Sequence, residues 1–456
     1  MIDKYRKWFI HIAASLAFGL ILLDETVVAV ALPTIQKEFS MSLVLSHWVM
    51  NSYLLVLAGF IAIGGKLGDI FGFRKIFIIG LLLFGVSSIS AGFAHSPAWL
   101  ISSVTIQGLG AAIMFPTSVA IIAYVFPPEQ RGLAMGIFGS IGTVFLSIGP
   151  LIGGYFTETI SWRWIFWINV PIVTIIITLF LSAWREPVLK QKNVKFDLKG
   201  LVTLVSGITL LVLAIMQGPD WGWDSKLIIS LFVLSAVLII LFCYTELKVN
   251  NPLIELDLFR SGTFNVSNLQ IFTGQFCKLA VVVFGALYFQ KVLHMSPFQA
   301  GIALLPAMIP IPIMAVICGR VTDRYGPRYP SILGLMLGAL AIIMIGIVTE
   351  FKNYDYILPL LVFYGLSQPY LYTPPRVAVT NSVSDEKQGQ ASGIVSTAQM
   401  IGATMSVALL SAVLLEFNSF MIVFIVTGTF ALIVTLLGWF YLDPENKLGK
   451  NISNQN

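Results

Sequence analysis

Long apolar stretches recur along the whole chain, and each is long enough to cross a lipid bilayer. A membrane-spanning helix needs about 20 mostly apolar residues, because the hydrocarbon core of a bilayer is about 30 Å thick. Of the 456 residues, 57% are hydrophobic and only 11% are charged, whereas about a quarter of the residues of a soluble domain are charged. The chain is therefore predicted to use lipid as its solvent, which excludes a soluble enzyme or binding module.

The apolar stretches predict an all-α membrane protein with about fourteen transmembrane helices. The first six are expected near residues 8–32, 45–65, 75–94, 98–125, 131–157 and 162–182. Two more follow near 198–217 and 226–246. The last six are expected near 263–290, 297–318, 330–349, 355–378, 389–415 and 419–441.

These spans divide the chain into five predicted parts, built around two six-helix bundles. The parts are an N-terminal six-helix bundle (1–184), two inserted helices (185–246), a cytoplasmic linker (247–262), a C-terminal six-helix bundle (263–443) and a cytoplasmic tail (444–456).

The placement of basic residues predicts the orientation of the chain. Cytoplasmic loops of membrane proteins retain an excess of Lys and Arg. Of the 27 Lys and Arg residues, 20 fall in the tails and even-numbered loops and only five in the odd-numbered loops. We therefore expect a multi-pass protein of the bacterial cytoplasmic (inner) membrane with both termini in the cytoplasm. The net charge of +5 reflects this bias and indicates no nucleic-acid partner.

Two short loop sequences occur twice, once in each predicted block of six spans. Residues 65–74 read GKLGDIFGFR and residues 319–328 read GRVTDRYGPR, an offset of 254 residues. Residues 129–137 read EQRGLAMGI and residues 386–394 read EKQGQASGI, an offset of 257 residues. Two pairs in register predict two related bundles around a central site, as in many transporters.

Four motifs resemble those of a known family. The loop at 65–75 looks like the hallmark loop of the major facilitator superfamily. Residues 23–33, LDETVVAVALP, resemble the first-helix motif of its fourteen-span drug:proton antiporter branch, the multidrug efflux type. Residues 149–154, GPLIGG, resemble the fifth-helix antiporter motif, and residues 162–171, WRWIFWINVP, are similar to the start of the sixth helix in that branch.

The resemblance covers essentially the whole chain. It implies a major facilitator fold and a secondary active transporter, not an enzyme, that exports amphipathic, drug-like small molecules and so confers drug resistance. It also implies proton antiport by alternating access. The proton gradient would then be the energy source, with no cofactor and no metal. The expected partners are a small-molecule substrate, protons and the lipid bilayer, and we expect a monomer.

Ionisable side chains inside the predicted spans mark a candidate proton-coupling site and substrate cavity. A charge at this depth costs several kcal/mol, so its presence indicates function. The candidates, together with one buried amide, are Asp24, Glu25, Lys278, Arg376 and Gln107. A carboxyl group in a low-dielectric cavity can load and release a proton near neutral pH, which is what a proton-coupled exporter needs. Asp24 occupies the motif position in the resemblance, whereas Glu25 occupies a variable one.

The repeat offset suggests how these charges are arranged. Adding 254 to Asp24 gives Lys278, so we hypothesise that these two residues form a gated ion pair across a central cavity. The alternative for Lys278 is that its side chain reaches a membrane interface. Arg376 is expected to contact a lipid headgroup, a backbone carbonyl or a substrate anion.

Two further groups of residues are predicted to move during transport. By resemblance, the glycine-rich fifth span opens or seals the route between the halves, since its small residues permit close helix contact and its proline removes a backbone hydrogen bond. These residues are Gly149, Pro150, Gly153 and Gly154. The repeated loops are predicted to form latches, in which Asp69 faces a helix N-terminus or a basic residue such as Arg131 in the outward-facing state. The remaining latch candidates are Asp323, Arg74, Arg324 and Arg328.

One departure from the family pattern weakens the prediction of proton coupling. Val104 stands where the family normally carries an arginine that is associated with proton transfer. Two alternatives therefore stay open. One is a dedicated exporter of a single metabolite, such as a siderophore or another anion, which Lys278 and Arg376 favour. The other is a membrane-embedded enzyme or sensor, for which the sequence offers neither a catalytic cluster nor a soluble domain.

Overall fold

The computed structural model describes residues 4–41, 43–184, 197–249, 252, 254–295, 297–384 and 387–442. Every regular element within these residues is a helix, and thirteen helical segments are long and apolar enough to cross a membrane. The predicted all-α membrane fold is therefore confirmed. The predicted tail at 444–456 and the beginning of the predicted insert, 185–196, lie outside the described residues.

The first bundle contains the first six predicted spans. Its helices are α1 (Lys4–Glu38), α2 (Leu43–Phe71), α3 (Phe73–Gly92), α4 (Pro97–Val125), α5 (Pro128–Thr159), α6 (Trp164–Trp167) and α7 (Asn169–Ala183). Helix α1 packs along α5, and α4 packs against both α2 and α3. Stacked rings fill the bundle core, where the Phe18 ring lies 4.9 Å from the ring of Phe115 and 4.4 Å from that of Phe138.

The second bundle follows a short 3-10 helix, η1 (Leu256–Arg260). Its first elements are α10 (Gly262–Leu279), the π-helix η2 (Ala280–Phe284), α11 (Gly285–Lys291), α12 (Pro297–Met308), α13 (Pro310–Tyr325) and α14 (Arg328–Val348), which ends in η3 (Thr349–Phe351). The remaining elements are α15 (Tyr354–Ser367), η4 (Gln368–Leu371), α16 (Thr373–Asn381), α17 (Gln388–Phe417) and α18 (Phe420–Tyr441).

The structure corrects the prediction of continuous helices for two spans. The span expected at 355–378 is divided into α15, η4 and α16, and it is the fourteenth crossing that the thirteen continuous segments leave out. The span expected at 297–318 is divided before Pro310 into α12 and α13. Proline explains both interruptions, because it lacks the backbone N–H that a continuous helix uses. Pro369 begins the break in the first case.

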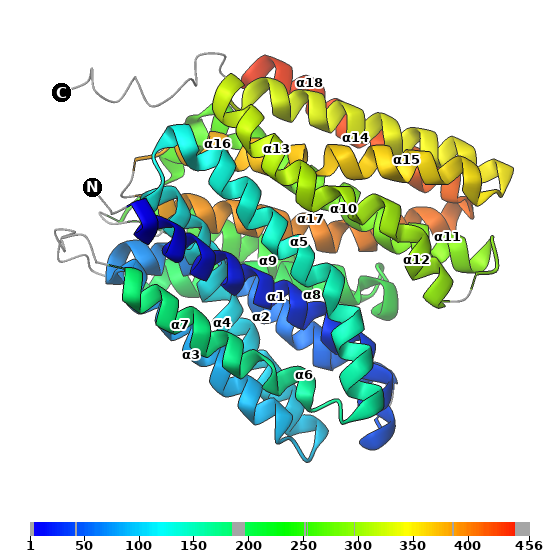
Figure 1. Cartoon of the computed structure of the whole chain (residues 1–456), viewed down its shortest axis with the longest axis horizontal. Coiled ribbons are helices and arrows are strands. Elements are labelled where there is room, and N and C mark those ends of the chain that lie inside the picture. Colours follow the sequence, from blue (N-terminus) through cyan, green and yellow to red (C-terminus); the bar gives the residue numbers. More distant parts are fainter. Residues whose placement is uncertain are drawn as a thin grey trace.

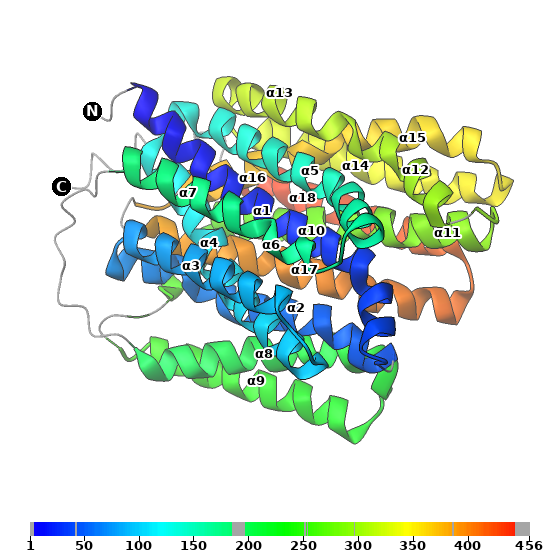
Figure 2. The same cartoon turned by 60° about the horizontal axis from the view of Figure 1, so that its bottom comes forward.

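The inserted helices α8 (Leu198–Trp221) and α9 (Lys226–Glu246) form a hairpin on the outside of the protein (Figure 2). The Ser235 hydroxyl donates to the Gly207 carbonyl at 2.8 Å and joins the two helices. Helix α8 contacts α2 of the first bundle and α17 of the second. Its contact with α2 is tight, because a methyl group on Gly59 would collide with the Thr209 hydroxyl.

The two bundles meet along two seams, α5 against α13 and α2 against α17. Figure 1 shows the bundles close together at the end where α1 begins and diverging toward the opposite end. We call these the terminal end and the distal end. The divergence leaves distal residues of α5 uncovered, since Leu151 is 72% and Tyr155 is 61% exposed. The fold is therefore closed between the bundles at the terminal end only.

Candidate functional site

Asp24 lies in a buried polar cluster of the first bundle, where it is 3% exposed. Its Oδ1 accepts hydrogen bonds from Nε2 of Gln107 and from Nδ2 of Asn169, both at 2.9 Å. The same two amides donate to the Ser88 hydroxyl oxygen at 2.9 and 3.2 Å. A buried carboxylate needs such donors, because no water replaces its hydration shell. The structure thus brings together the two predicted residues Asp24 and Gln107.

Sequence reasoning gave no role to Asn169 or Ser88. Asn169 is the first residue of α7 and fully buried, and the signal that could have found it is an amide inside a predicted span. Ser88 carries no such signal, since serines in membrane helices usually bond to their own backbone. It does so here too, because its hydroxyl donates to the Phe84 carbonyl at 2.7 Å.

The cluster can accommodate Asp24 with or without a proton. In this structure two N–H groups point to the carboxylate. Gln107 Oε1 and Asn169 Oδ1 have no hydrogen-bond partner among the described residues. Rotation of either amide by half a turn would present its oxygen to a protonated carboxyl group, which is a donor. The site can therefore hold or release one proton by turning an amide.

A hollow beside the cluster is lined by the two adjacent acids and by apolar side chains. The lining residues are Asp24, Glu25, Val28, Val49, Met50, Tyr53, Leu54 and Val104. Glu25 is exposed within this interior, and the buried Tyr53 hydroxyl has no hydrogen-bond partner in the described part of the chain. Apolar walls with a few polar groups are typical of a small-molecule site.

Arg376 lies opposite, in α16 of the second bundle, and is 5% exposed. Its Nη2 donates to Oε1 of Gln399, whose Nε2 donates in turn to Oε1 of Gln275 at 3.4 Å. The Tyr372 hydroxyl donates to the same Gln275 oxygen at 2.9 Å. The guanidinium also lies 5.9 Å from the centre of the Phe115 ring, which belongs to the first bundle. Arg376 is therefore held at the interface of the two bundles by neutral groups.

Lys278 is half-buried in the last turn of α10, one turn beyond Gln275. It is attracted electrostatically by Glu25 across the interface and repelled by Arg376. Within the described residues it makes no ion pair with Asp24 in this state, and the acid with which it interacts is Glu25. The reason is geometric. Successive residues of a helix point about 100° apart, so Asp24 faces α4 and α7 while Glu25 faces the second bundle.

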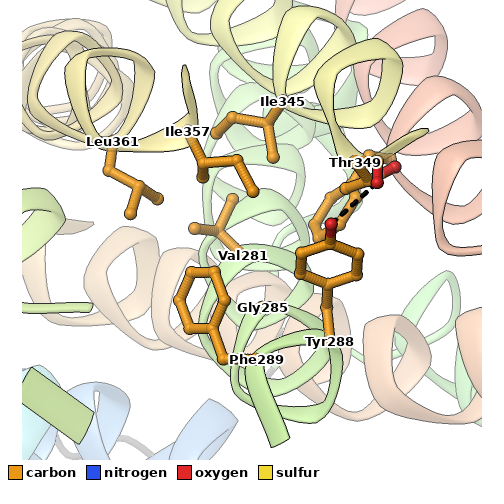
Figure 3. A pocket seen from close by; sticks show the side chains of 9 residues that line it. Val281, Gly285, Tyr288, Phe289, Ile345, Thr349, Ile357 and Leu361 are labelled. Atoms are coloured by element: carbon orange, nitrogen blue, oxygen red, sulfur yellow. Dashed lines mark hydrogen bonds between the residues drawn. The ribbon is translucent and has the colours of Figure 1, made fainter. Parts of the chain in front are cut away.

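A small apolar cavity lies beside the π-helix that follows Lys278 (Figure 3). Its lining residues are Val281, Gly285, Tyr288, Phe289, Ile345, Thr349, Ile357, Leu361 and Phe424. The Tyr288 hydroxyl points to the Thr349 carbonyl and donates to it at 2.7 Å. None of the lining side chains is charged, so we interpret this cavity as a packing gap beside η2.

The terminal end is closed by a carboxylate from each bundle. Asp323, in the last turn of α13, accepts hydrogen bonds from the backbone N–H groups of Gly132 (2.7 Å) and Leu133 (2.8 Å) in the second turn of α5, which begins at Pro128. The helices touch here, because a Cβ on Gly319 would lie 2.8 Å from the Leu133 Cα. A carboxylate at a helix N-terminus is stabilised by free N–H donors and by the helix dipole. We call this contact the Asp323 latch.

The Asp69 latch repeats this arrangement on the other seam. Asp69, in the last turn of α2, accepts from the backbone N–H groups of Gly389 (3.1 Å) and Gln390 (2.9 Å) at the start of α17. The prediction that Asp69 faces a helix N-terminus thus agrees with the structure. The sequence offsets of 254 and 257 residues relate the two latches residue by residue.

Arg131 does not pair with Asp69 but joins three helix ends. Its Nε donates to the carbonyls of Ala123 (2.9 Å) and Phe126 (3.2 Å) at the end of α4. Its Nη1 crosses to the second bundle and donates to the Thr380 carbonyl (3.3 Å) and to Asn381 Oδ1 (3.0 Å) at the end of α16. Arg131 therefore reinforces the closed terminal end.

The other basic latch candidates do not contact the latch carboxylates. Arg74 and Arg324 are exposed and make no hydrogen bond or ion pair in the part of the chain that the structure describes. Arg328 donates to the Trp439 carbonyl at 2.8 Å and joins α14 to α18. Backbone N–H groups, not these cations, compensate the two aspartates.

The glycine motif of α5 packs on the part of α1 that carries the two acids. A Cβ on Gly149 would collide with the Thr26 hydroxyl, and a Cβ on Gly153 would lie 3.0 Å from the Val27 carbonyl oxygen. Gly154 has no neighbour within 4 Å at the corresponding point. The side chain of Pro150 lies outside the described part of the structure. Two of the motif glycines are therefore required for the close approach of α1 and α5.

At the distal end, Glu38 connects the end of α1 to the loop before α6. It accepts from Trp162 Nε1 at 2.6 Å and from Arg163 Nη2 at 2.8 Å, and Arg163 also donates to the Ala94 carbonyl at 3.2 Å. The hydrogen bond from Arg163 lowers the pKa of Glu38 below its ordinary value. These contacts hold α1, α3 and α6 together where the bundles diverge.

Two related bundles that enclose a charged interior site, joined at one end and separated at the other, are the architecture of a secondary transporter. The chain belongs to the Major Facilitator Superfamily, whose family model matches residues 14–403 and, in a second match, 266–455. The resemblance noted from the motifs is thereby confirmed.

Similar proteins include several named for drug resistance. The chain is 32% identical over 404 residues to the multidrug resistance protein Stp of Mycobacterium tuberculosis, covering 88% of this chain and 75% of Stp. It is 31% identical over 420 residues to the puromycin resistance protein pur8 of Streptomyces alboniger, covering 90% of this chain and 82% of that protein. These two relatives are thus named for resistance to several drugs and to an antibiotic.

Solved structures with the same fold are more distant in sequence. The proton:xylose symporter XylE aligns over 98% of both chains with a TM-score of 0.71 and 15% identity. The human organic anion transporter MFSD10 aligns over 95% of this chain and 99% of its own with a TM-score of 0.69, also at 15% identity. At this identity the likeness shows the fold alone.

Proposed function

We propose that this protein exports amphipathic, drug-like small molecules in exchange for protons. The observation that carries the proposal is Asp24, a carboxyl group buried among neutral amides at the edge of a largely apolar hollow. Such a group can hold a proton in one step of the cycle and lose it in another, and a change in its charge alters what the hollow binds. The drug-resistance names of the relatives support the choice of substrate.

The proposed cycle is alternating access, in which the two bundles rock about the central site. The terminal end is the cytoplasmic side, so the described state is outward-facing, with both latches fastened. A proton that enters from outside binds Asp24 and displaces a cationic substrate group from the neighbouring acids. The latches then open, the proton leaves to the cytoplasm, and a new substrate binds. Because residue 104 is Val104 and not the usual arginine, no guanidinium at this position stabilises the Asp24 carboxylate. The amides of Gln107 and Asn169 stabilise it instead.

The remaining parts of the proposal concern the setting of the protein. It lies in the bacterial inner membrane with both termini in the cytoplasm, as the excess of basic residues on that side predicts. The proton gradient is the energy source, without a cofactor. The transport unit is a monomer, since one chain supplies both bundles and both latches.

Transport by purified protein in proteoliposomes tests the proposal. We expect uptake of ethidium to follow an imposed pH gradient in the wild type, and Asp24→Asn to abolish this dependence while exchange of labelled for unlabelled ethidium continues. Asp257→Asn is the control, because that acid is 75% exposed on η1. Equal gradient-driven uptake by Asp24→Asn and wild type would overturn the proposal.

A dedicated metabolite exporter is the second candidate, favoured by the two cations Lys278 and Arg376. In that case, cells that carry Asp24→Asn would keep the wild-type level of resistance to several unrelated lipophilic cations. A loss of resistance to all of them favours the multidrug function.

A further inference from the structure

The charged groups of the central site are separated by sign between the two bundles. The first bundle contributes the acids Asp24 and Glu25, and the second contributes Lys278 and Arg376. The neutral groups follow the same division. Amide N–H groups surround the acid in the first bundle, whereas an amide oxygen accepts from the guanidinium in the second. Each bundle is thus suited to one sign of charge.

Arg376 is the member whose charge is least compensated. It is only 5% exposed, and it forms no ion pair with an acid within the described residues. Its Nε has no hydrogen-bond partner there. A buried cation is costly unless an anion and further acceptors compensate it. A guanidinium presents donors in a planar fork that fits a carboxylate, which makes it a ready site for such a group.

Lys278 and Glu25 extend this site across the interface. They interact electrostatically from opposite bundles, and Glu25 is exposed toward the hollow. A molecule with one positive and one negative group can enter between them without leaving either charge uncompensated. Its positive group faces Glu25 and its negative group faces Lys278 and Arg376. A molecule with a single charge would leave one side without a partner.

We propose that this exporter prefers zwitterionic amphiphiles to simple cations, because their carboxylate binds Arg376 and Lys278 while their cationic group binds Glu25. The inference rests on the proposed function and specifies its substrate class. Antiport favours a zwitterion over a simple anion. A proton on Asp24 makes the site more positive and would draw an anion in with it, whereas the cationic end of a zwitterion competes with the proton. The apolar walls at Val28, Met50 and Leu54 receive the body of the molecule.

A matched pair of dyes tests the inference. A rhodamine free acid is zwitterionic, and its methyl ester keeps the same ring system and cationic group but lacks the carboxylate. Binding of each dye to the full-length protein in lipid nanodiscs is measured by fluorescence polarisation. We expect the free acid to bind about tenfold more tightly than the ester, the size of one charge-assisted hydrogen bond.

Variants of the cationic residues identify the source of this preference. Arg376→Gln and Lys278→Met should each weaken binding of the free acid about tenfold and leave the ester within about twofold of wild type. Arg376→Lys, which keeps the charge, should retain part of the preference and shows that loss in Arg376→Gln is not misfolding. Lys291→Met is the control, since that lysine is exposed at the end of α11.

Three results would overturn the inference: equal binding of the two dyes to wild type, no binding of the free acid, or equal weakening of both dyes in the variants. Proton-driven transport of the ester that depends on Asp24 would then still support the proposed function. Conversely, a preference for the acid that depends on Arg376, without any effect of a pH gradient on transport, would support the substrate site and overturn proton coupling.

Discussion

Removing the charge of Asp323 should shift the protein away from the state described. The carboxylate accepts two backbone N–H bonds from the second turn of α5, at 2.7 and 2.8 Å. Asn has the same shape but only one acceptor oxygen, so Asp323→Asn turns an NH₂ group toward one of the two N–H donors. When the terminal end opens, water can hydrate either side chain, and the substitution therefore penalises the closed state specifically.

The size of the effect follows from these contacts. A hydrogen bond to a charged group contributes about 1.5–3 kcal/mol, and the interaction of a carboxylate with a helix N-terminus contributes about 0.3–1 kcal/mol. Loss of one such bond and of the charge thus costs the closed state about 2–4 kcal/mol. Because 1.4 kcal/mol corresponds to a factor of ten, the ratio of closed to open molecules should fall roughly 30- to 700-fold.

Hydrogen exchange measured by mass spectrometry reports this change directly. The amides of Gly132 and Leu133 are the donors that the Asp323 latch protects, so they should exchange faster in Asp323→Asn. Asp69→Asn should have a smaller effect on its own seam, because its hydrogen bonds are longer, at 2.9 and 3.1 Å. Exchange in Asp323→Asn at the wild-type rate would refute the reasoning. A larger effect of Asp69→Asn would refute the ranking of the two latches.

Three further substitutions give distinct outcomes. Gly149→Ala should lower the thermal unfolding temperature by forcing α1 and α5 apart, at a cost of about 1–3 kcal/mol. Gly154→Ala is the control, because its added methyl group meets open space and should not lower that temperature. Equal shifts in the two variants would argue against tight packing at Gly149. Asn169→Ala removes one donor from the first-helix acid and should destabilise the fold by about 1–3 kcal/mol, seen as a lower unfolding temperature in detergent. The pKa of Glu38 is lowered in the folded state, so its bond to Arg163 stabilises the fold above the ordinary value of 4.5 and this stabilisation disappears as the pH falls through the folded-state pKa. Glu38→Gln should therefore unfold more easily than wild type at pH 7, and this difference should shrink as the pH falls below 4.5; a difference that does not change as the medium is acidified would contradict the assignment.

The helical architecture was predictable because apolar length and internal repetition are properties of the sequence itself. The offset of 254 residues correctly identified Asp69 and Asp323 as equivalent before any contact was known. The same offset does not bring Asp24 and Lys278 into an ion pair among the described residues in this state. Equivalent positions in two bundles share a depth in the membrane, but the direction of a side chain depends on the rotation of each helix, which the repeat does not specify.

The polar partners were the least predictable part of the site. Asn169 and Ser88 lie far from Asp24 in sequence, and they reach it only because α7 packs against α1 while α3 packs against α4 and α7. Backbone N–H groups leave no trace in the amino-acid pattern, so the partners of the latch carboxylates could be described only as a helix N-terminus. The interruption of the twelfth span was not predicted, because prolines in a sequence do not distinguish a broken helix from a kinked one.

The hairpin of α8 and α9 restricts how the two bundles can rock. Because the hairpin contacts both bundles, it cannot stay fixed to both when the bundles tilt relative to each other. The fit of Thr209 against Gly59 is too close to allow slippage past α2, so the hairpin travels with the first bundle. In the proposed transport cycle α17 would therefore slide along α8, and bulky residues added at that sliding contact should slow turnover without touching the substrate.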